Sequence, residues 1–189
     1  MAQEADVGTV LRAVVGQLEI WWWGGVTVRL QGLSDDEYFW KPVPDAHCLR
    51  RRDGELFCDW PPGSRGETIP PVTTIAWRMA HIAQGCFVDR WHTYFTPAKV
   101  DWQQLPFPDN AADALAYLEE WKTTWVSAVV AAGEERLWEP LGDSQDDMAM
   151  MQLGRTDPFI GLVLHLNREV MHHGAEICLL RDLYRAQQG

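Results

Sequence analysis

Four stretches of the chain carry apolar residues at the three- and four-residue steps of an amphipathic α-helix. They cover roughly residues 7–30, 72–94, 110–133 and 157–189. No stretch alternates apolar and polar residues over the length of a long strand. The intervening residues 41–71 are punctuated by proline and glycine, which indicates a loop. The sequence therefore predicts an all-α fold, a four-helix bundle with a long loop between helices 1 and 2.

Local patterns predict where these helices begin and end. Ser34 and Glu37 form a capping-box pair, which indicates a short helical turn after the first helix. A threonine cap within residues 72–74 is expected to start the second helix, and Gly133 to end the third. Asp157, followed by a proline, is expected to be the N-cap of the fourth helix. The segment between Gly133 and Asp157 is therefore predicted to be a loop.

Length and charge limit the classes of protein to consider. A chain of 189 residues has the length of one domain, so we expect a single bundle domain over residues 1–189. The formal net charge is −11, and no cluster of lysine and arginine offers an anion-binding surface. We therefore expect no binding to nucleic acid or to an anionic membrane surface.

Targeting and redox features are also absent from the sequence. No run approaches the roughly 20 apolar residues of a membrane span. The N-terminal residues are acidic, whereas those of a signal peptide would be basic. The four cysteines form no C-x-x-C pair, so no cysteine-based zinc site is indicated. These features favour a reduced, cytoplasmic protein.

The fourth helix carries the densest group of polar side chains: His165, Glu169, His172, His173 and Glu176. Glu169 and His173 are four residues apart, so a helix places them on one face. Imidazole and carboxylate together suit Zn²⁺, Ni²⁺, Fe²⁺ or Mn²⁺. His81, in a largely apolar part of the second helix, is the candidate third ligand. Spacing alone leaves two alternatives open, a solvated Glu–His pair on the fourth helix and a hydrogen-bonded core histidine on the second.

Four nearby side chains have roles that the sequence leaves open. Trp77, one turn before His81, is expected either to line the pocket or to pack in the core. His165 is a candidate fourth ligand, proton shuttle or supporting residue. His172 points about 100° away from the next residue, so it should lie outside the coordination sphere. Glu176 is expected either to orient a histidine ligand or to form a surface ion pair.

Residues 73–82 and 167–177 resemble the two hallmark regions of the DinB-like superfamily. This group includes the metal-binding domain of mycothiol-dependent maleylpyruvate isomerase and the bacillithiol and mycothiol S-transferases. The resemblance covers essentially the whole chain and implies a four-helix bundle. It also implies that the metal is held by His81 from the second helix and by Glu169 and His173, an E-x-x-x-H pair, from the last.

The resemblance implies a divalent-metal-dependent enzyme with Zn²⁺ or Ni²⁺ as the metal. The expected activity is transfer of a low-molecular-weight thiol, such as mycothiol, to a small electrophilic substrate. Two alternatives remain. One is a metal-dependent hydrolase, in which the same ligands activate water. The other is a non-catalytic metal-binding module of a stress response.

The eleven tryptophans include three in succession, at positions 21–23. Three consecutive side chains span about 200° of a helix, so they cannot all face one core. At least one is expected to face the pocket, a loop or a second subunit. Because aromatic side chains are enriched at subunit interfaces, we expect a homodimer.

Overall fold

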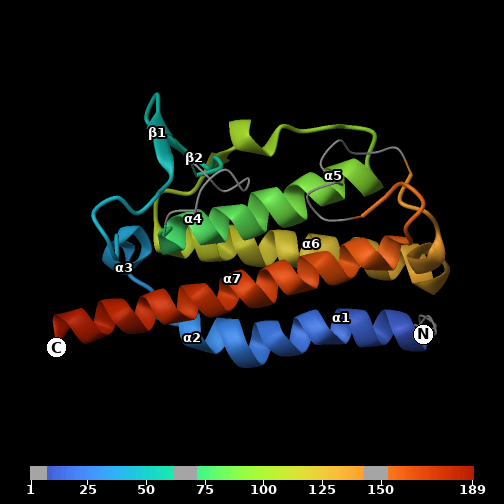
Figure 1. Ribbon diagram of the computed structural model, residues 1–189, viewed down its shortest axis with the longest axis horizontal. Coiled ribbons are helices and arrows are strands. Elements are labelled where there is room, and N and C mark those ends of the chain that lie inside the picture. Colours follow the sequence, from blue (N-terminus) through green and yellow to red (C-terminus); the bar gives the residue numbers. More distant parts are fainter. Residues whose placement is uncertain (1–7, 62–71, 143–152) are drawn as a thin grey trace, which may run out of the picture.

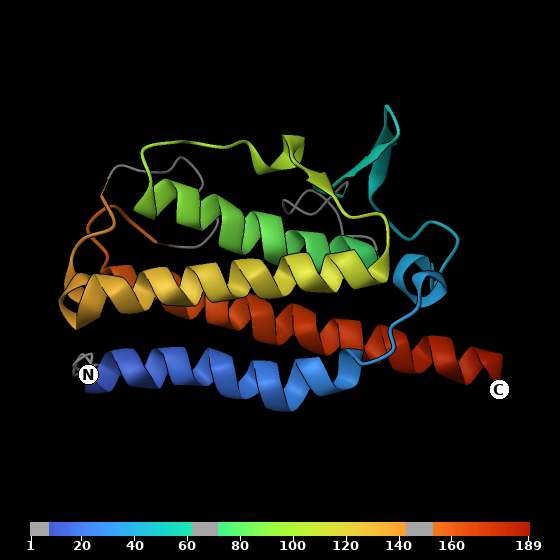
Figure 2. The ribbon, with the colours of Figure 1, turned by 180° about the vertical axis from the view of Figure 1, so that it is seen from behind.

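The computed structural model describes residues 8–61, 72–142 and 153–189, with only the backbone at Trp23. Within this part the chain is mostly helical, which confirms the predicted fold class. Four long helical stretches lie side by side, and α1 begins at the end opposite the C-terminus (Figures 1 and 2). None of the described helices combines the length and apolar character that a membrane span requires.

The first stretch is a continuous helical rod whose winding changes midway. α1 (Thr9–Trp21) passes into the π-helical segment η1 (Trp22–Thr27) and then into α2 (Val28–Leu30). Its buried residues repeat at the predicted three- and four-residue steps: Leu11, Val14, Leu18, Trp22, Val26 and Leu30. Trp22 is in the core and Trp21 packs against it. A single chain does not test the predicted homodimer, which stays a prediction.

A short helix follows, as the capping box predicts. In α3 (Asp35–Phe39) the hydroxyl of Ser34 accepts a hydrogen bond from the backbone N–H of Glu37 at 3.2 Å. In return, the carboxylate of Glu37 accepts from the backbone N–H of Ser34 at 3.0 Å. The two reciprocal bonds satisfy donors that the start of a helix leaves without partners.

The second stretch carries the first of the candidate site residues. It consists of α4 (Ile75–Ala80), the π-helical segment η2 (His81–Val88) and α5 (Asp89–Phe95). Thr74 is its N-cap, and the hydroxyl accepts from the backbone N–H of Trp77 at 3.2 Å. The predicted threonine cap and the predicted end near residue 94 are both confirmed.

The third stretch, α6 (Ala111–Trp138), runs past the predicted end. Gly133 does interrupt it, with φ of 81°, but helical winding resumes up to Trp138. The predicted loop start at residue 134 is therefore wrong. The kink has a use, because the Glu134 carboxylate accepts hydrogen bonds from the backbone N–H groups of Val10 and Leu11, at 2.9 and 3.1 Å. The turn at Gly133 thus supplies an anionic cap to the start of α1.

The fourth stretch, α7 (Phe159–Gln188), begins one residue later than predicted. Its N-cap is Pro158, with ψ of 147°, so the prediction of Asp157 as N-cap is wrong. The cause is a short strand-like pairing with residues 139–141. The backbone N–H of Leu141 donates to the carbonyl of Asp157, and that of Phe159 donates to the carbonyl of Glu139, both at 2.9 Å. This pairing holds Pro158 extended.

The long loop contains a β-hairpin that the sequence pattern did not reveal, and this hairpin is part of a small sheet. β1 (Arg50–Arg52) and β2 (Glu55–Phe57) form an antiparallel hairpin, and β3 (Pro106–Phe107) joins β2. Strands of two or three residues are too short to show alternation. The hairpin lies beside α4 (Figure 1), and η3 (Trp102–Gln104) precedes β3. Residues 62–71 of the predicted loop lie outside the described part of the chain.

Gly174 of α7 allows the first helical rod to approach closely. A Cβ there would stand 2.9 Å from Cγ2 of Val26 and 3.3 Å from Nε1 of Trp21, and Val26 is fully buried. Gly16 in α1 is the matched control, because its Cβ would meet nothing within 4 Å. We expect Gly174→Ala to be less stable than Gly16→Ala by about 1–3 kcal/mol, the cost of overpacking. Urea unfolding followed by circular dichroism measures the difference, and equal stabilities would contradict the close approach.

Candidate metal centre

The candidate metal centre lies where the second helical stretch packs against α7. His81 is the first residue of η2, and its side chain is buried. The imidazole stacks on the indole of Trp77, one turn earlier, with ring centroids 5.1 Å apart and planes 6° apart. The indole N–H of Trp77 donates to the backbone carbonyl of Asp59 at 2.6 Å, which ties this pair to the long loop. Nε2 is the nitrogen of His81 that approaches Glu169 of α7.

Glu169 and His173 of α7 meet His81 at one carboxylate oxygen. Oε2 of Glu169 lies 3.1 Å from Nε2 of His173 and 3.6 Å from Nε2 of His81. The two imidazole rings are nearly perpendicular, with centroids 4.8 Å apart. The three residues that the resemblance implied as ligands are therefore neighbours in space, although 88 residues separate His81 from Glu169 in the sequence.

Glu176 contacts the other nitrogen of His173. Nδ1 of His173 lies 2.6 Å from Oε2 of Glu176, and Nη1 of Arg78 lies 2.9 Å from the same oxygen and 3.0 Å from Nδ1. The sequence left an orienting contact and a surface ion pair open for Glu176; in the structure Glu176 contacts the histidine and also pairs with Arg78, whose side chain is largely buried. A carboxylate on Nδ1 fixes the ring of a histidine and leaves Nε2 directed at Glu169.

Cys86 is the neighbour that the sequence did not single out. Its Sγ lies 4.0 Å from Nε2 of His81, and the side chain is buried. The ligand atoms of His81, Cys86 and Glu169 all lie within 4.8 Å of one another, the single group of this kind in the described residues. On an α-helix, positions five apart are separated by about 140° of rotation. Helical periodicity therefore gave no reason to pair Cys86 with His81.

His165 and His172 lie at the edge of this cluster. Nδ1 of His165 is 3.7 Å from Oε1 of Glu169. Burial lowers the pKa of His165 to about 4, so its imidazole is neutral at pH 7. His172 stacks on His173 with ring centroids 5.0 Å apart, but its side chain is largely exposed. Nε2 of His172 lies 3.6 Å from Oε1 of Glu176, so His172 contacts the cluster through this carboxylate.

Charge in the cluster is arranged to hold a cation. Burial by itself would raise the pKa of Glu169, but hydrogen bonds with His173 and His81 outweigh it and keep that pKa far below its ordinary value. Burial likewise acts to lower the pKa of His173, and hydrogen bonds with Glu169 and Glu176 outweigh it and raise the pKa. For His81, burial prevails and lowers the pKa. The cluster thus favours a positive charge at His173, where a metal cation would replace a proton.

The donor set fits a divalent transition metal. Donor atoms about 2.0–2.3 Å from a tetrahedral Zn²⁺ stand about 3.3–3.7 Å from one another. Of the two distances from Glu169 Oε2, 3.6 Å lies within that range and 3.1 Å lies slightly below it. The distance of 4.0 Å between Cys86 Sγ and His81 Nε2 is slightly longer. Imidazole, carboxylate and thiol are all donors that Zn²⁺ accepts. The ligand atoms of His81, Cys86 and Glu169 are mutually close, and His173 joins them through Glu169.

Tryptophans surround the buried imidazole of His81. Besides the stacked Trp77, the rings of Trp60 and Trp102 have their centroids 5.2 and 6.5 Å from that of His81. Gly85 gives them room, because a Cβ there would stand 3.2 Å from Nδ1 of His81 and 3.5 Å from Trp102. Three of the eleven tryptophans thus line the site, and their apolar surface keeps water from one side of it.

The family model of the DinB superfamily matches residues 23–177. The matched region spans well over half of the chain and includes every residue of the cluster. The chain belongs to the DinB superfamily. No curated protein and no solved structure matches it. Membership confirms the resemblance and is consistent with a metal-binding, enzyme-like protein. Superfamily membership alone does not choose among a thiol transferase, a hydrolase and a non-catalytic module.

Proposed function

We propose that this DinB-superfamily protein binds one Zn²⁺ or Ni²⁺ ion through His81, Glu169 and His173. The observation that carries the proposal is their convergence on one carboxylate oxygen, with Nε2 of each histidine directed at it. Three protein ligands leave room for a substrate in the coordination sphere, which is typical of catalytic sites. The contacts of His173 with Glu176 support the same assignment, because metal-binding histidines usually donate their second N–H to a carboxylate.

The activity that we propose is transfer of a low-molecular-weight thiol, such as mycothiol, to a small electrophile. When bound, the metal supplies a Lewis acid that lowers the pKa of a coordinated thiol. The chain's own residues position the reactants. Glu176 and Arg78 hold the ring of His173 in place. Trp60 and Trp77 cover the imidazole of His81 and exclude water from that side of the site.

Thiol dependence of turnover tests this activity. Metal-loaded protein is mixed with monochlorobimane as electrophile and with mycothiol, bacillithiol or glutathione as thiol. We expect conjugate fluorescence above the uncatalysed rate with one of these thiols, lost on chelation and restored by Zn²⁺ or Ni²⁺. Ester or amide hydrolysis without added thiol would instead support the hydrolase. Metal-loaded protein with neither activity would contradict the enzyme and favour the non-catalytic module.

A further inference from the structure

We propose that Cys86 supplies a fourth ligand to the metal, an inference that rests on the proposed site at His81, Glu169 and His173. Helical periodicity assigns Cys86 no role, whereas its position beside His81 and Glu169 in the structure makes it a candidate ligand. Its thiol is buried and lies on the side of His81 that carries Nε2, the same nitrogen that approaches Glu169. A sulfur, a nitrogen and a carboxylate oxygen therefore lie within 4.8 Å of one another.

The winding of η2 brings the thiol to this position. In a π-helix the backbone hydrogen bonds join residues five apart, so a residue lies nearly above the fifth residue before it. His81 is the first residue of η2, and Cys86 is the fifth residue after it. The segment returns to α-helix at α5. The chain thus departs from regular α-helical winding where the departure aligns a thiol with a histidine. Such π-helical segments are frequent at functional sites.

None of the other three described cysteines belongs to this ligand group, although Cys58 is also buried and lies close enough to Cys86 to interact with it. Cys48 accepts a hydrogen bond from the hydroxyl of Thr74 at 3.3 Å. Cys178 is half-buried on α7, in the charge environment of Arg29 and Asp182. Neither belongs to a group of three potential ligands in the described part of the chain. Cys178 is therefore the matched control, because it lies on the same helix as Glu169 and His173 but outside the cluster.

A thiolate ligand would change which metal ions the site prefers and how a coordination position becomes available to a substrate. Sulfur favours Zn²⁺ over hard ions such as Mg²⁺ or Mn²⁺. With a metal bound, an incoming small thiol would displace Cys86: its sulfur would replace that of Cys86 as the ligand, and its proton would pass to the released Cys86 thiolate. One thiolate would replace another and the proton would only move from the incoming thiol to Cys86, so the charge of the site would not change and no proton would be released to solvent. Cys86 holds the position of the small thiol until that thiol arrives.

Cobalt spectroscopy tests the ligand directly. Chelator-stripped protein is titrated with Co²⁺, and thiolate coordination gives a sulfur-to-cobalt charge-transfer band in the near ultraviolet. We expect this band in the wild type and in Cys178→Ser, and its loss in Cys86→Ser. The visible d–d bands should persist in Cys86→Ser, with affinity reduced roughly tenfold or more, at least the loss caused by a missing supporting contact.

The possible outcomes separate this inference from the metal site itself. Stoichiometric Co²⁺ binding with no charge-transfer band in the wild type would overturn the role of Cys86 and leave the three-ligand site standing. No Co²⁺ binding at all would overturn the metal site as well. If Cys86→Ser does not fold, zinc-edge X-ray absorption of the wild type decides. One sulfur at about 2.3 Å supports the ligand, and only nitrogen and oxygen neighbours exclude it.

Discussion

Glu169→Gln is expected to lower metal affinity by at least 100-fold while leaving the helical fold intact. Glu169 supplies the oxygen that both histidines approach and the negative charge that attracts a cation to the cluster. Loss of a supporting residue alone costs about 10–100-fold in affinity, so loss of a ligand should cost more. Competition with a chromophoric chelator measures the affinity, and far-ultraviolet circular dichroism measures the helix content. Thiol conjugation should fall with the bound metal.

Variants of two further carboxylates of α7 provide comparisons for the affinity of Glu169→Gln. Glu176→Gln should weaken binding by about 10–100-fold, because Glu176 contacts His173 at Nδ1 and not at the Nε2 that faces Glu169. Asp182→Asn should leave affinity unchanged, because Asp182 pairs with Arg29 at the exposed surface. If Glu169→Gln bound metal as tightly as Asp182→Asn, Glu169 would not be a ligand.

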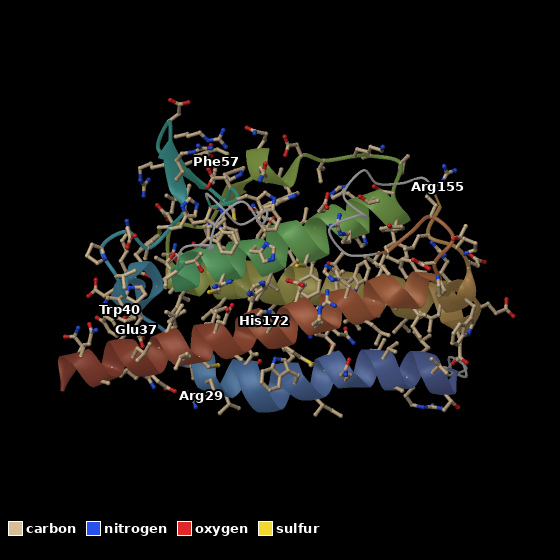
Figure 3. The ribbon with its side chains drawn as sticks, viewed as in Figure 1. Arg29, Glu37, Trp40, Phe57, Arg155 and His172 are labelled. Atoms are coloured by element: carbon tan, nitrogen blue, oxygen red, sulfur yellow. The ribbon has the colours of Figure 1, made fainter. Side chains whose placement is uncertain are left out.

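Glu37→Gln is expected to lower the free energy of unfolding by about 3–5 kcal/mol, the cost of leaving a buried charge without its partner. Nε of Arg181 lies 3.0 Å from Oε1 of Glu37, and both side chains are almost fully buried. The guanidinium also donates to the backbone carbonyl of Arg29. Figure 3 shows Glu37 and Arg29 on opposite sides of α7, so Arg181 joins the helix to both neighbours. Urea unfolding at pH 7 measures the loss.

A double variant separates the lost charge from lost packing. Glu37→Leu combined with Arg181→Met removes both charges and keeps apolar volume. Replacing a whole buried ion pair in this way is often neutral or stabilising, so the double variant should recover most of the loss. A cost below about 1 kcal/mol for Glu37→Gln, the range of an exposed ion pair, would show that the pair is not desolvated.

The Glu37–Arg181 pair should also make the stability of the protein depend on pH. Burial acts to raise the pKa of Glu37, but hydrogen bonds from Arg181 and from the N–H of Ser34 outweigh burial and lower that pKa. A carboxyl whose pKa falls on folding stabilises the protein fully above its unfolded value, about 4.3, and loses that contribution as the pH falls through the folded value. The wild type should therefore lose stability below about pH 4.3 more steeply than Glu37→Gln.

Periodicity was sufficient for the helices and insufficient for their irregularities. The helical stretches of α1, α4 and α7 follow from apolar residues at three- and four-residue steps, because burial of one face dominates helix stability. The Ser34 and Thr74 caps are also readable, since each depends on a side chain within four residues. The continuation of α6 past Gly133 is different. It depends on Glu134 reaching the start of α1, a contact between residues 124 positions apart.

The site shows the same division. The spacing of Glu169 and His173 on one helix predicts that they can share a cation. His81 is predicted from its position in an apolar run and from the family resemblance. Cys86 could not be chosen, because its place beside His81 depends on a change from α to π winding. Gly85 between them was the nearest hint, and its small size fits the close packing against Trp102. Trp60, which also contacts His81, comes from the long loop, where no periodicity applies.

Metal content is the most direct measurement of whether the cluster is a metal centre. The protein is purified without a nickel column or chelators and analysed by plasma mass spectrometry beside Glu169→Gln prepared in the same way. We expect close to one Zn²⁺ or Ni²⁺ ion per chain in the wild type and almost none in the variant. A wild type that contains no transition metal and takes up none when Zn²⁺, Ni²⁺ or Mn²⁺ is added would contradict the metal centre and the enzyme built on it.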